Sequence, residues 1–408
     1  MTMWIVILGI VLALAVASII YLISRFKKFY IVERLAGDRK ALRWLIACVP
    51  MLGFVVYGIF DLVNSIMAML HLAIFWLIFD IVAAVMRRVK KNKAAGLEGA
   101  GEAEKASAEK SAGKKASAGK TAESEAAEGA AKRQGKVYWL GVAVILTTFI
   151  YLAAGWFFAH HVYETNYELH TEKNLGTDKL RVALIADSHI GALFDGDGFA
   201  EHIETIQKAE PDVLLITGDY VDDSTKREDM VKSCAALGRL KTTYGVYYSC
   251  GNHDKGYYRG RDFSYEELKA ELEKNGVTVL EDETVLLNDS FYIVGRQDKS
   301  EKDRASAGEL TSGLDKSKYI IMMDHQPNDY DAEAAAEADL VLSGHTHGGQ
   351  MLPMGFFGEK IFRANDRTYG KEVRGNTTFI VTSGIADWAI RFKTGTIAEY
   401  VVIDIYGK

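Results

Sequence analysis

Cysteine and proline are scarce in this sequence, with only 3 Cys and 4 Pro among 408 residues. Three cysteines cannot form a disulfide framework. We expect Cys48, Cys234 and Cys250 to be free thiols, with one bridge between the last two left open as an alternative. A content of 49% apolar and 25% charged residues excludes a collagen-like or wholly disordered chain. The length predicts two or three structural units.

An excess of positive charge is absent from the C-terminal part. The first 136 residues hold more Lys and Arg than Asp and Glu, while the whole chain has a net charge of −6, so residues 170–408 are strongly acidic. A protein that binds nucleic acid needs a basic face, and this class of partner is therefore excluded. Nothing in the sequence indicates a protein partner.

Four segments are long, apolar and almost free of charge. They are residues 3–23, 44–60, 62–86 and 137–159. Each is long enough, or nearly so, to cross a bilayer as a helix, and we predict four transmembrane helices with these bounds. His71 and Asp80 lie within the third segment, on opposite sides of the helix. We expect both to make hydrogen bonds between helices rather than to form an ion pathway.

Lys and Arg are concentrated on one side of these segments. They lie between the first and second helices and in residues 87–136, whereas the turn between the second and third helices has none. The positive-inside rule then predicts a multi-pass protein of the cell membrane. Its N-terminus and residues 160–408 would be extracytoplasmic, and residues 87–136 would form a cytoplasmic linker. Within this linker, residues 94–131 have low complexity and no aromatics, which is typical of a disordered tether.

Residues 178–408 alternate between short apolar runs and helical patterns. We predict strands at 180–186, 213–217, 245–249, 319–323, 340–343, 379–382 and 397–403, and helices at 199–209, 226–241, 265–275 and 331–337. This alternation predicts an α/β domain. Residues 160–177 would connect it to the fourth transmembrane helix.

Polar side chains directly follow five of the predicted strands. They are Asp187 and His189; Asp219 and Asp222; Asn252, His253 and Asp254; His325; and His345 and His347. The carboxyl ends of strands in an α/β sheet are where ligands bind. Oxygen and nitrogen donors without Cys suit Mn, Fe or Zn rather than Ca. Any one of these motifs is more often a turn, but five in series predict a metal site, because buried charges need a partner.

The order DxH, GDxxD, GNHD, H and GHTH resembles the calcineurin-like metallophosphoesterase superfamily over about residues 178–405. The run GHTHGGQ at residues 344–350 looks like its membrane-associated bacterial branch. The resemblance implies a four-layer α/β/β/α sandwich, two divalent metal ions and hydrolysis of a phosphoester. The implied ligands are Asp187, His189 and His347 for one metal, and Asn252, His325 and His345 for the other, with Asp219 bridging both.

The resemblance also implies roles for three residues that do not bind metal. His253 would face the scissile phosphate, and Asp254, at a position that is often Glu, would orient it through a hydrogen bond. Asp222 would support the ligands. A hydroxide bridging the two metals would attack phosphorus in line with the leaving oxygen, which His253 would protonate. Ser188 is a small spacer in this interpretation.

Two further features are candidates for substrate contact. Arg391 either binds a substrate phosphate or forms a surface salt bridge. Phe356 and Phe357, in the apolar run at residues 351–357, either shape the access of a membrane-proximal substrate or pack into the core. The favoured prediction is a membrane-anchored phosphodiesterase that acts on a lipid-linked or cell-envelope phosphoester. The alternatives are a non-catalytic metal-bound sensor or scaffold for a phosphorylated ligand, and a transporter with an appended domain.

Overall fold

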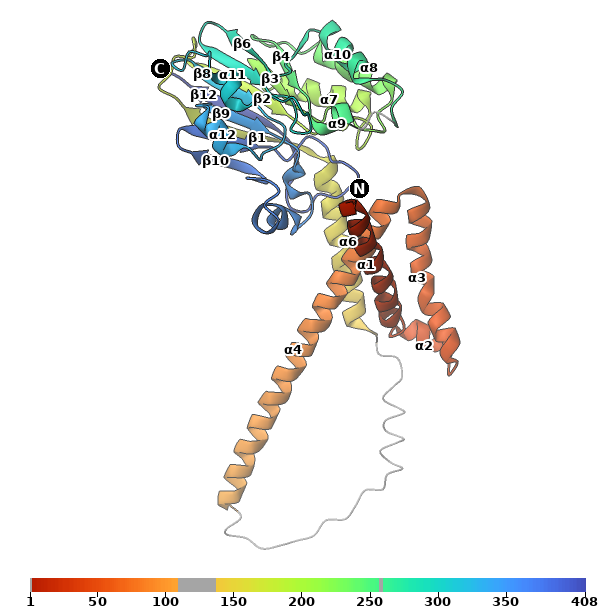
Figure 1. Ribbon diagram of the computed structural model, residues 1–408. Coiled ribbons are helices and arrows are strands. Elements are labelled where there is room, and N and C mark those ends of the chain that lie inside the picture. Colours follow the sequence, from red (N-terminus) through yellow and green to blue (C-terminus); the bar gives the residue numbers. More distant parts are fainter. Residues whose placement is uncertain (1, 109–136, 257–259) are drawn as a thin grey trace. The chain divides into compact units, whose positions relative to one another are not determined.

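The computed structural model describes residues 2–108 and 137–408 apart from 257–259, while the side chains of residues 2–8, 10, 11 and 94–108 lie outside the description. The chain divides into two compact units, Met1–Tyr151 and Leu152–Lys408 (Figure 1). Of the tether predicted for residues 94–131, the part from residue 109 onward lies outside the described residues. Its beginning, up to Ala108, belongs to a helix.

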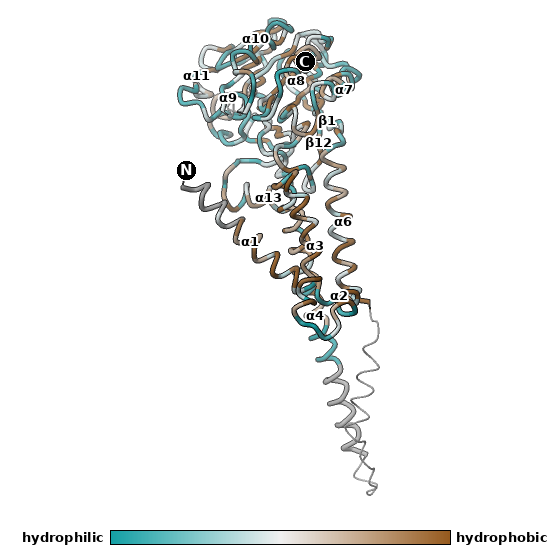
Figure 2. Tube along the Cα trace, turned by 90° about the vertical axis from the view of Figure 1, so that its right-hand side faces the viewer, coloured by the Kyte–Doolittle hydropathy of each residue, from teal (hydrophilic) through white to brown (hydrophobic). Residues whose placement is uncertain are grey.

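The first unit consists of helices. They are α1 (Thr2–Phe26), α2 (Tyr30–Ala36), α3 (Lys40–Phe60), α4 (Leu62–Ala108) and the first part of α6 (Trp139–His160). Among the described residues, three helical stretches are long and apolar enough to cross a membrane: Lys40–Phe60, Leu62–Lys93 and Trp139–His160 (Figure 2). The sequence predicts four. The missing one corresponds to α1, whose described apolar part, Leu12–Phe26, is shorter than a membrane span.

The hydrogen bond between helices predicted for two ionisable side chains is present for Asp80 and wrong for His71. Asp80 of α4 accepts a hydrogen bond from Tyr21 of α1 at 2.7 Å and pairs with Arg25 at 2.8 Å. The hydrogen bond between helices that we expected for Asp80 is thereby confirmed. His71 bonds a carbonyl of its own helix at 2.7 Å and stacks on Tyr151, with 5.6 Å between ring centroids. For His71 the contact between helices is therefore a ring stack.

The second unit contains two six-stranded sheets. The first has the order β1 (Val162–His170), β12 (Ala398–Tyr406), β2 (Lys179–Ile185), β3 (Val213–Thr217), β4 (Val246–Ser249) and β5 (Val277–Val279). The second has the order β10 (Gly370–Arg374), β11 (Thr377–Val381), β9 (Leu340–Ser343), β8 (Tyr319–Met323), β7 (Phe291–Gly295) and β6 (Glu283–Leu287). Strands β2, β3 and β4 are parallel, as are β7, β8, β9 and β11, so within each set the carboxyl ends share one edge.

The two sheets pack face to face, and helices cover both outer faces. In β2, Val182 and Leu184 belong to the core between the sheets, whereas Ala183 and Ile185 pack in the core that includes α7 (Gly196–Gln207), α8 (Arg227–Leu237) and α10 (Tyr265–Lys274). On the other side, α11 (Ala307–Thr311) and α12 (Tyr330–Ala335) cover the second sheet. Because side chains alternate along a strand, β2 contributes to the core between the sheets and to the core beneath the helices. The mixed α/β sheets and four layers are those that the sequence predicts.

The chain passes from α6 into the first sheet almost without a break. Helix α6 ends at His160, and β1 begins at Val162 and pairs in parallel with β12 along its whole length. The connector predicted for residues 160–177 is therefore partly an edge strand, and the second unit begins at Leu152 rather than at residue 178. No flexible spacer separates the end of α6 from the sheet.

Candidate metal centre

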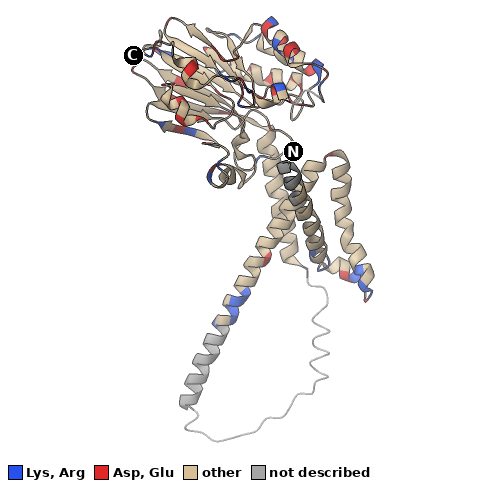
Figure 3. Ribbon diagram, viewed as in Figure 1, with Lys and Arg blue, Asp and Glu red and all other residues tan. Residues whose placement is uncertain are grey.

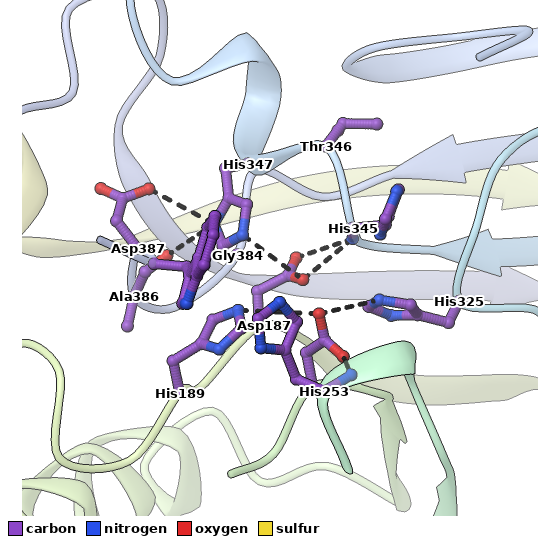
Figure 4. A network of polar contacts seen from close by, with 12 residues as sticks. Asp187, His189, His253, His325, His345, Thr346, His347, Gly384, Ala386 and Asp387 are labelled. Carbon is purple, nitrogen blue, oxygen red and sulfur yellow. Dashed lines mark hydrogen bonds and ion pairs between the residues drawn. The ribbon is translucent and has the colours of Figure 1, made fainter. Parts of the chain in front are cut away.

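The polar residues predicted after the strands converge on one site between the ends of the two sheets (Figure 4). Ligand atoms of Asp187, His189 and His347 all lie within 4.8 Å of one another, and those of Asp219, His325 and His345 form a second such group. The carboxylates, His189 and His325 are buried, while His345 and His347 are half-buried. The two groups contain six of the seven ligands that the family resemblance implies, all except Asn252.

Asp219 lies between the two groups. Its Oδ2 is 3.1 Å from His325 Nε2 and 3.7 Å from His189 Nε2, a position that suits a carboxylate shared by two cations. Asn252 Oδ1 and both ring nitrogens of His189 are buried without a hydrogen-bond partner among the described residues. Buried polar atoms seldom lack partners. A divalent cation would account for Asn252 Oδ1 and for one ring nitrogen of His189, so the residues present fit the metals that the family implies.

Strained backbone presents several of these side chains to the site. Positive φ angles occur at Asp187 (+53°), His189 (+37°), Asp219 (+51°), His345 (+70°) and His347 (+49°). Such angles are uncommon outside glycine and persist where the surroundings impose them, often at functional sites. Gly218, with φ +78°, permits the turn before Asp219, and a Cβ on it would lie 2.5 Å from His325 Nδ1. The close approach of the loops therefore requires glycine there.

Hydrogen bonds fix the orientation of the ligands. The backbone N–H of His345 donates to both carboxylate oxygens of Asp187, at 2.9 and 3.0 Å, and so joins the loops after β9 and β2. His325 Nδ1 lies 2.9 Å from the carbonyl oxygen of Thr217. This contact keeps a proton on Nδ1 and orients Nε2 toward Asp219, so that Nε2 would be the ligand atom when a metal replaces its proton.

Burial and neighbouring charges shift the pKa values of the ligands. Burial lowers the pKa of His189 to about 3 and that of His345 to about 4, so both rings stay neutral, the form that binds metal. Burial also acts to lower the pKa of His325, but the charge of Asp219 outweighs it and raises this pKa well above its usual value. Reciprocally, His325 lowers the pKa of Asp219 despite its burial. The carboxylate of Asp219 is therefore ionised.

The carboxylate next to His253 is Asp222, which corrects the expectation that Asp254 orients this histidine. Asp222 Oδ1 lies 3.4 Å from His253 Nδ1. Burial acts to raise the pKa of Asp222, but the hydrogen bond with His253 lowers it below its usual value. Asp254 is fully buried and accepts hydrogen bonds from three backbone amides, among them that of Gly251 at 2.7 Å. Its carboxylate ties the loop after β4 to the loop after β3.

Two buried carboxylates near the ligands escape the sequence analysis. Asp387 Oδ1 lies 3.4 Å from His347 Nδ1 and 3.0 Å from Lys393 Nζ, and both Asp387 and Lys393 are fully buried. Asp298 is fully buried as well and accepts two hydrogen bonds from Gln326, the residue after His325, both at 2.9 Å. Asp298 follows β7, a strand that the sequence analysis does not predict, and Asp387 lies six residues after the end of β11, so the rule that located the other ligands misses both.

The predicted substrate contacts lie outside the two ligand groups. Phe356 and Phe357 are 60% and 38% exposed, so neither ring packs into the core, whereas Met351 at the start of the run is buried. Arg391 is exposed on the loop after β11. The same loop carries Trp388, whose ring centroid lies 5.0 Å from that of His253. A lone tryptophan in a loop has no spacing signal, and the sequence analysis passed over it.

The remaining nucleophilic side chains near the site are buried. Cys234 and Cys250 are free thiols, which confirms that no bridge joins them. Burial raises the pKa of each thiol to about 12, so neither is reactive. Ser188 is fully buried between two ligands, in agreement with a spacer role.

Comparisons with known proteins agree with this geometry. Residues 180–349 match the family described as Calcineurin-like phosphoesterase. An uncharacterized metallophosphoesterase of Aquifex aeolicus is 30% identical over 247 residues, which cover 59% of this chain and 91% of that protein. One from Helicobacter pylori is 34% identical over 237 residues, covering 56% of this chain and 60% of that protein, so the chain spans about three fifths of its length.

A relative from Danio rerio, named transmembrane protein with metallophosphoesterase domain, is 28% identical over 189 residues. The match covers 43% of this chain and 42% of that protein. The family match at residues 180–349 contains strands β2–β9, apart from the first residue of β2, and all the ligands that the resemblance implies. On this sequence similarity and the convergent ligand groups, the chain belongs to the calcineurin-like metallophosphoesterase family.

Proposed function

We propose that this protein is a metal-dependent phosphoesterase anchored in a membrane by its apolar helices. The observation that carries the proposal is the pair of His and Asp groups that meet at Asp219. The proposed ligands for two divalent ions of Mn, Fe or Zn are Asp187, His189, His347, Asp219, Asn252, His325 and His345. Their mixed oxygen and nitrogen donors suit these metals.

The proposed chemistry divides between the metals and the protein. When bound, divalent metals activate water and neutralise the charge of a phosphate. Asp222 holds His253 through Nδ1 and leaves Nε2 to donate a proton to the leaving oxygen. Trp388 lies against His253 and limits its movement. A sensor that only binds phosphate needs no proton donor held by a carboxylate, so this pair favours catalysis over the sensor alternative.

Two substitutions test these roles in the full chain. Asp219→Asn removes the shared charge and should abolish metal binding and hydrolysis together. His253→Ala should keep the metals and lower turnover by about 10²–10⁴-fold, the usual contribution of general acid–base catalysis. His202→Ala, which changes a histidine of α7 outside the site, is the matched control.

The measurements are metal content and hydrolysis of bis(p-nitrophenyl) phosphate and p-nitrophenyl phosphate. Loss of metal from the His253 variant would contradict its proposed role. Wild-type protein that binds metal yet hydrolyses no mono-, di- or pyrophosphate ester would instead favour the sensor.

We further propose that the substrate is a phosphodiester at the membrane surface, such as a lipid-linked or cell-envelope phosphoester. A pocket of about 310 Å³ lies beside Gly348 of the ligand turn. Its lining combines the apolar Leu352 and Phe356 with the cations Lys360 and Arg367. Such a lining suits an anionic ligand with an apolar part. In this proposal Phe356, Phe357 and Arg391 contact the substrate.

The proposed orientation has the second unit outside the cell membrane and residues 87–136 inside, with α6 crossing the bilayer between them. It is supported by the Lys and Arg that follow the apolar stretch of α4 and by those between α1 and α3 (Figure 3). Protease added to intact cells should cut the second unit and spare residues 94–131, which should be cut only after lysis. Cleavage of the linker in intact cells would mean the opposite orientation.

A further inference from the structure

Exposed apolar side chains are concentrated in one short segment of the second unit. They are Leu352, Met354, Phe356, Phe357, Ile361 and Phe362, which are between 38% and 72% exposed. Among the other described residues after 160, the exposed large apolar side chains are Val231, Leu286, Val373 and Trp388, which lie far apart in the sequence. Contiguous exposed apolar surface marks an interaction site. We name residues 352–362 the apolar loop.

The base of the apolar loop is attached to the end of α6. The N–H of Leu352 donates to Thr394 Oγ1 at 3.2 Å, and the N–H of the preceding Lys393 donates to the carbonyl oxygen of Gly155 at 2.8 Å. A Cβ on Gly155 would lie 2.6 Å from Thr394 Cγ2. Residues 393 and 394 therefore form a tight bridge between the apolar loop and the last turns of α6.

The end of α6 has the side chains of a membrane–water interface. Trp156 and Phe157 are 51% and 43% exposed. His160 and His161 stack on them, with ring centroids 4.3 and 4.4 Å apart. Tryptophan and other aromatic residues with a polar neighbour collect at the level of the lipid headgroups. The apolar loop, which includes α13 (Met354–Phe356), is attached at this level of α6 (Figure 2).

The charges in and next to the apolar loop also suit a lipid surface. Lys360 in the loop and Arg363, the residue that follows it, are exposed. The one acidic residue of the segment, Glu359, accepts a hydrogen bond from the N–H of Thr368 at 2.9 Å and pairs with Lys360 at 2.6 Å. Segments that lie in the interface combine apolar side chains with Lys or Arg that reach the headgroup phosphates.

We propose that the apolar loop inserts into the interface of the bilayer that α6 crosses. A lipid surface is the occupant that fits, because the loop is fastened beside the interfacial end of an apolar helix and carries cations at its edge. The second unit is then held to the bilayer at two points. Since the loop begins three residues after the ligand turn His347–Gly349, the site opens close to the lipid headgroups. This inference rests on the proposed membrane location and not on catalysis.

A fluorescent label on the full chain tests the insertion. In a Cys48→Ser background, where the two remaining cysteines are buried, Phe362→Cys or Val373→Cys receives an environment-sensitive NBD label. Both native side chains are exposed, 72% and 59%, so neither change disturbs a core, and Val373 lies on β10, outside the apolar loop. The labelled chains are placed in nanodiscs of phosphatidylcholine and phosphatidylglycerol, with or without lipids that carry a doxyl quencher near the headgroup.

The label at position 362 should emit at shorter wavelength and lose at least half of its intensity to the quencher, while the label at 373 should keep its intensity. No quenching at position 362 would overturn the proposal. Equal quenching at positions 362 and 373 would overturn it as well, because it would show only that the whole second unit lies near the bilayer. Hydrolysis is not measured, so failure of the phosphoesterase proposal is a separate result. Release of the chain from membranes by carbonate would separately contradict the membrane location.

Discussion

Replacing Lys393 by Met should destabilise the second unit strongly. Lys393 and Asp387 are fully buried and 3.0 Å apart, and no hydrogen bond reaches the carboxylate oxygens of Asp387 among the described residues. Met keeps the length of the side chain but leaves a buried carboxylate without its counter-charge, which costs about 3–5 kcal/mol. For a unit of this size, each kcal/mol shifts Tm by about 2–4 °C, so Tm should fall by about 6–20 °C.

The same substitution should weaken metal binding through His347. Asp387 lies 3.4 Å from His347 Nδ1, where a carboxylate holds the ring of a metal ligand in place. Without the ammonium group, nothing fixes the Asp387 carboxylate beside the ring, and His347 loses this support. Metal affinity should then fall by about 10–100-fold, as is usual when such a supporting partner is lost.

Pulse proteolysis in urea of the full chain in detergent measures the free energy of unfolding, and competition with a chelator measures metal affinity. Lys299→Met, at an exposed position, is the control and should change neither quantity. The double variant Asp387→Asn with Lys393→Met should regain most of the stability, since no charge stays unpaired, but not the metal affinity. A loss below about 1 kcal/mol for Lys393→Met, the range of an exposed ion pair, would refute the reasoning.

Two further pairs of variants test the site. Gly218→Ala should lower both Tm and metal affinity, because its Cβ would lie 2.5 Å from His325 Nδ1, whereas Gly276→Ala, with the same φ of +78° but nothing within 4 Å, should show backbone strain alone. Equal metal affinity in the two variants would contradict a steric effect on His325. Phe356→Ser combined with Phe357→Ser should impair hydrolysis of a bilayer-presented phosphodiester and spare both Tm and a small soluble diester, because both rings are exposed. Equal losses on both substrates would argue against membrane presentation.

The central strands could be read from the sequence because each is a short apolar run buried on both faces. Strands β3, β8 and β9 begin and end where the sequence predicts. Strands β1 and β10 have no such run, since exposed residues alternate along them with partly buried ones. Strand β1 forms because β12, more than 200 residues away, offers it a full-length partner. Pairing over that distance leaves no local signal.

The sequence by itself determined the ligand types, because a polar motif directly after an apolar strand is local information. It could not decide which carboxylate faces His253, since Asp222 and Asp254 follow different strands and only their packing separates them. Nor could it indicate that Lys393 is buried, because a lysine in a loop is ordinarily solvated. Phe356 and Phe357 show the converse, since apolar residues predict burial and tertiary packing left these two exposed. In each case burial depends on segments distant in the chain, and these meet only when the sheets close.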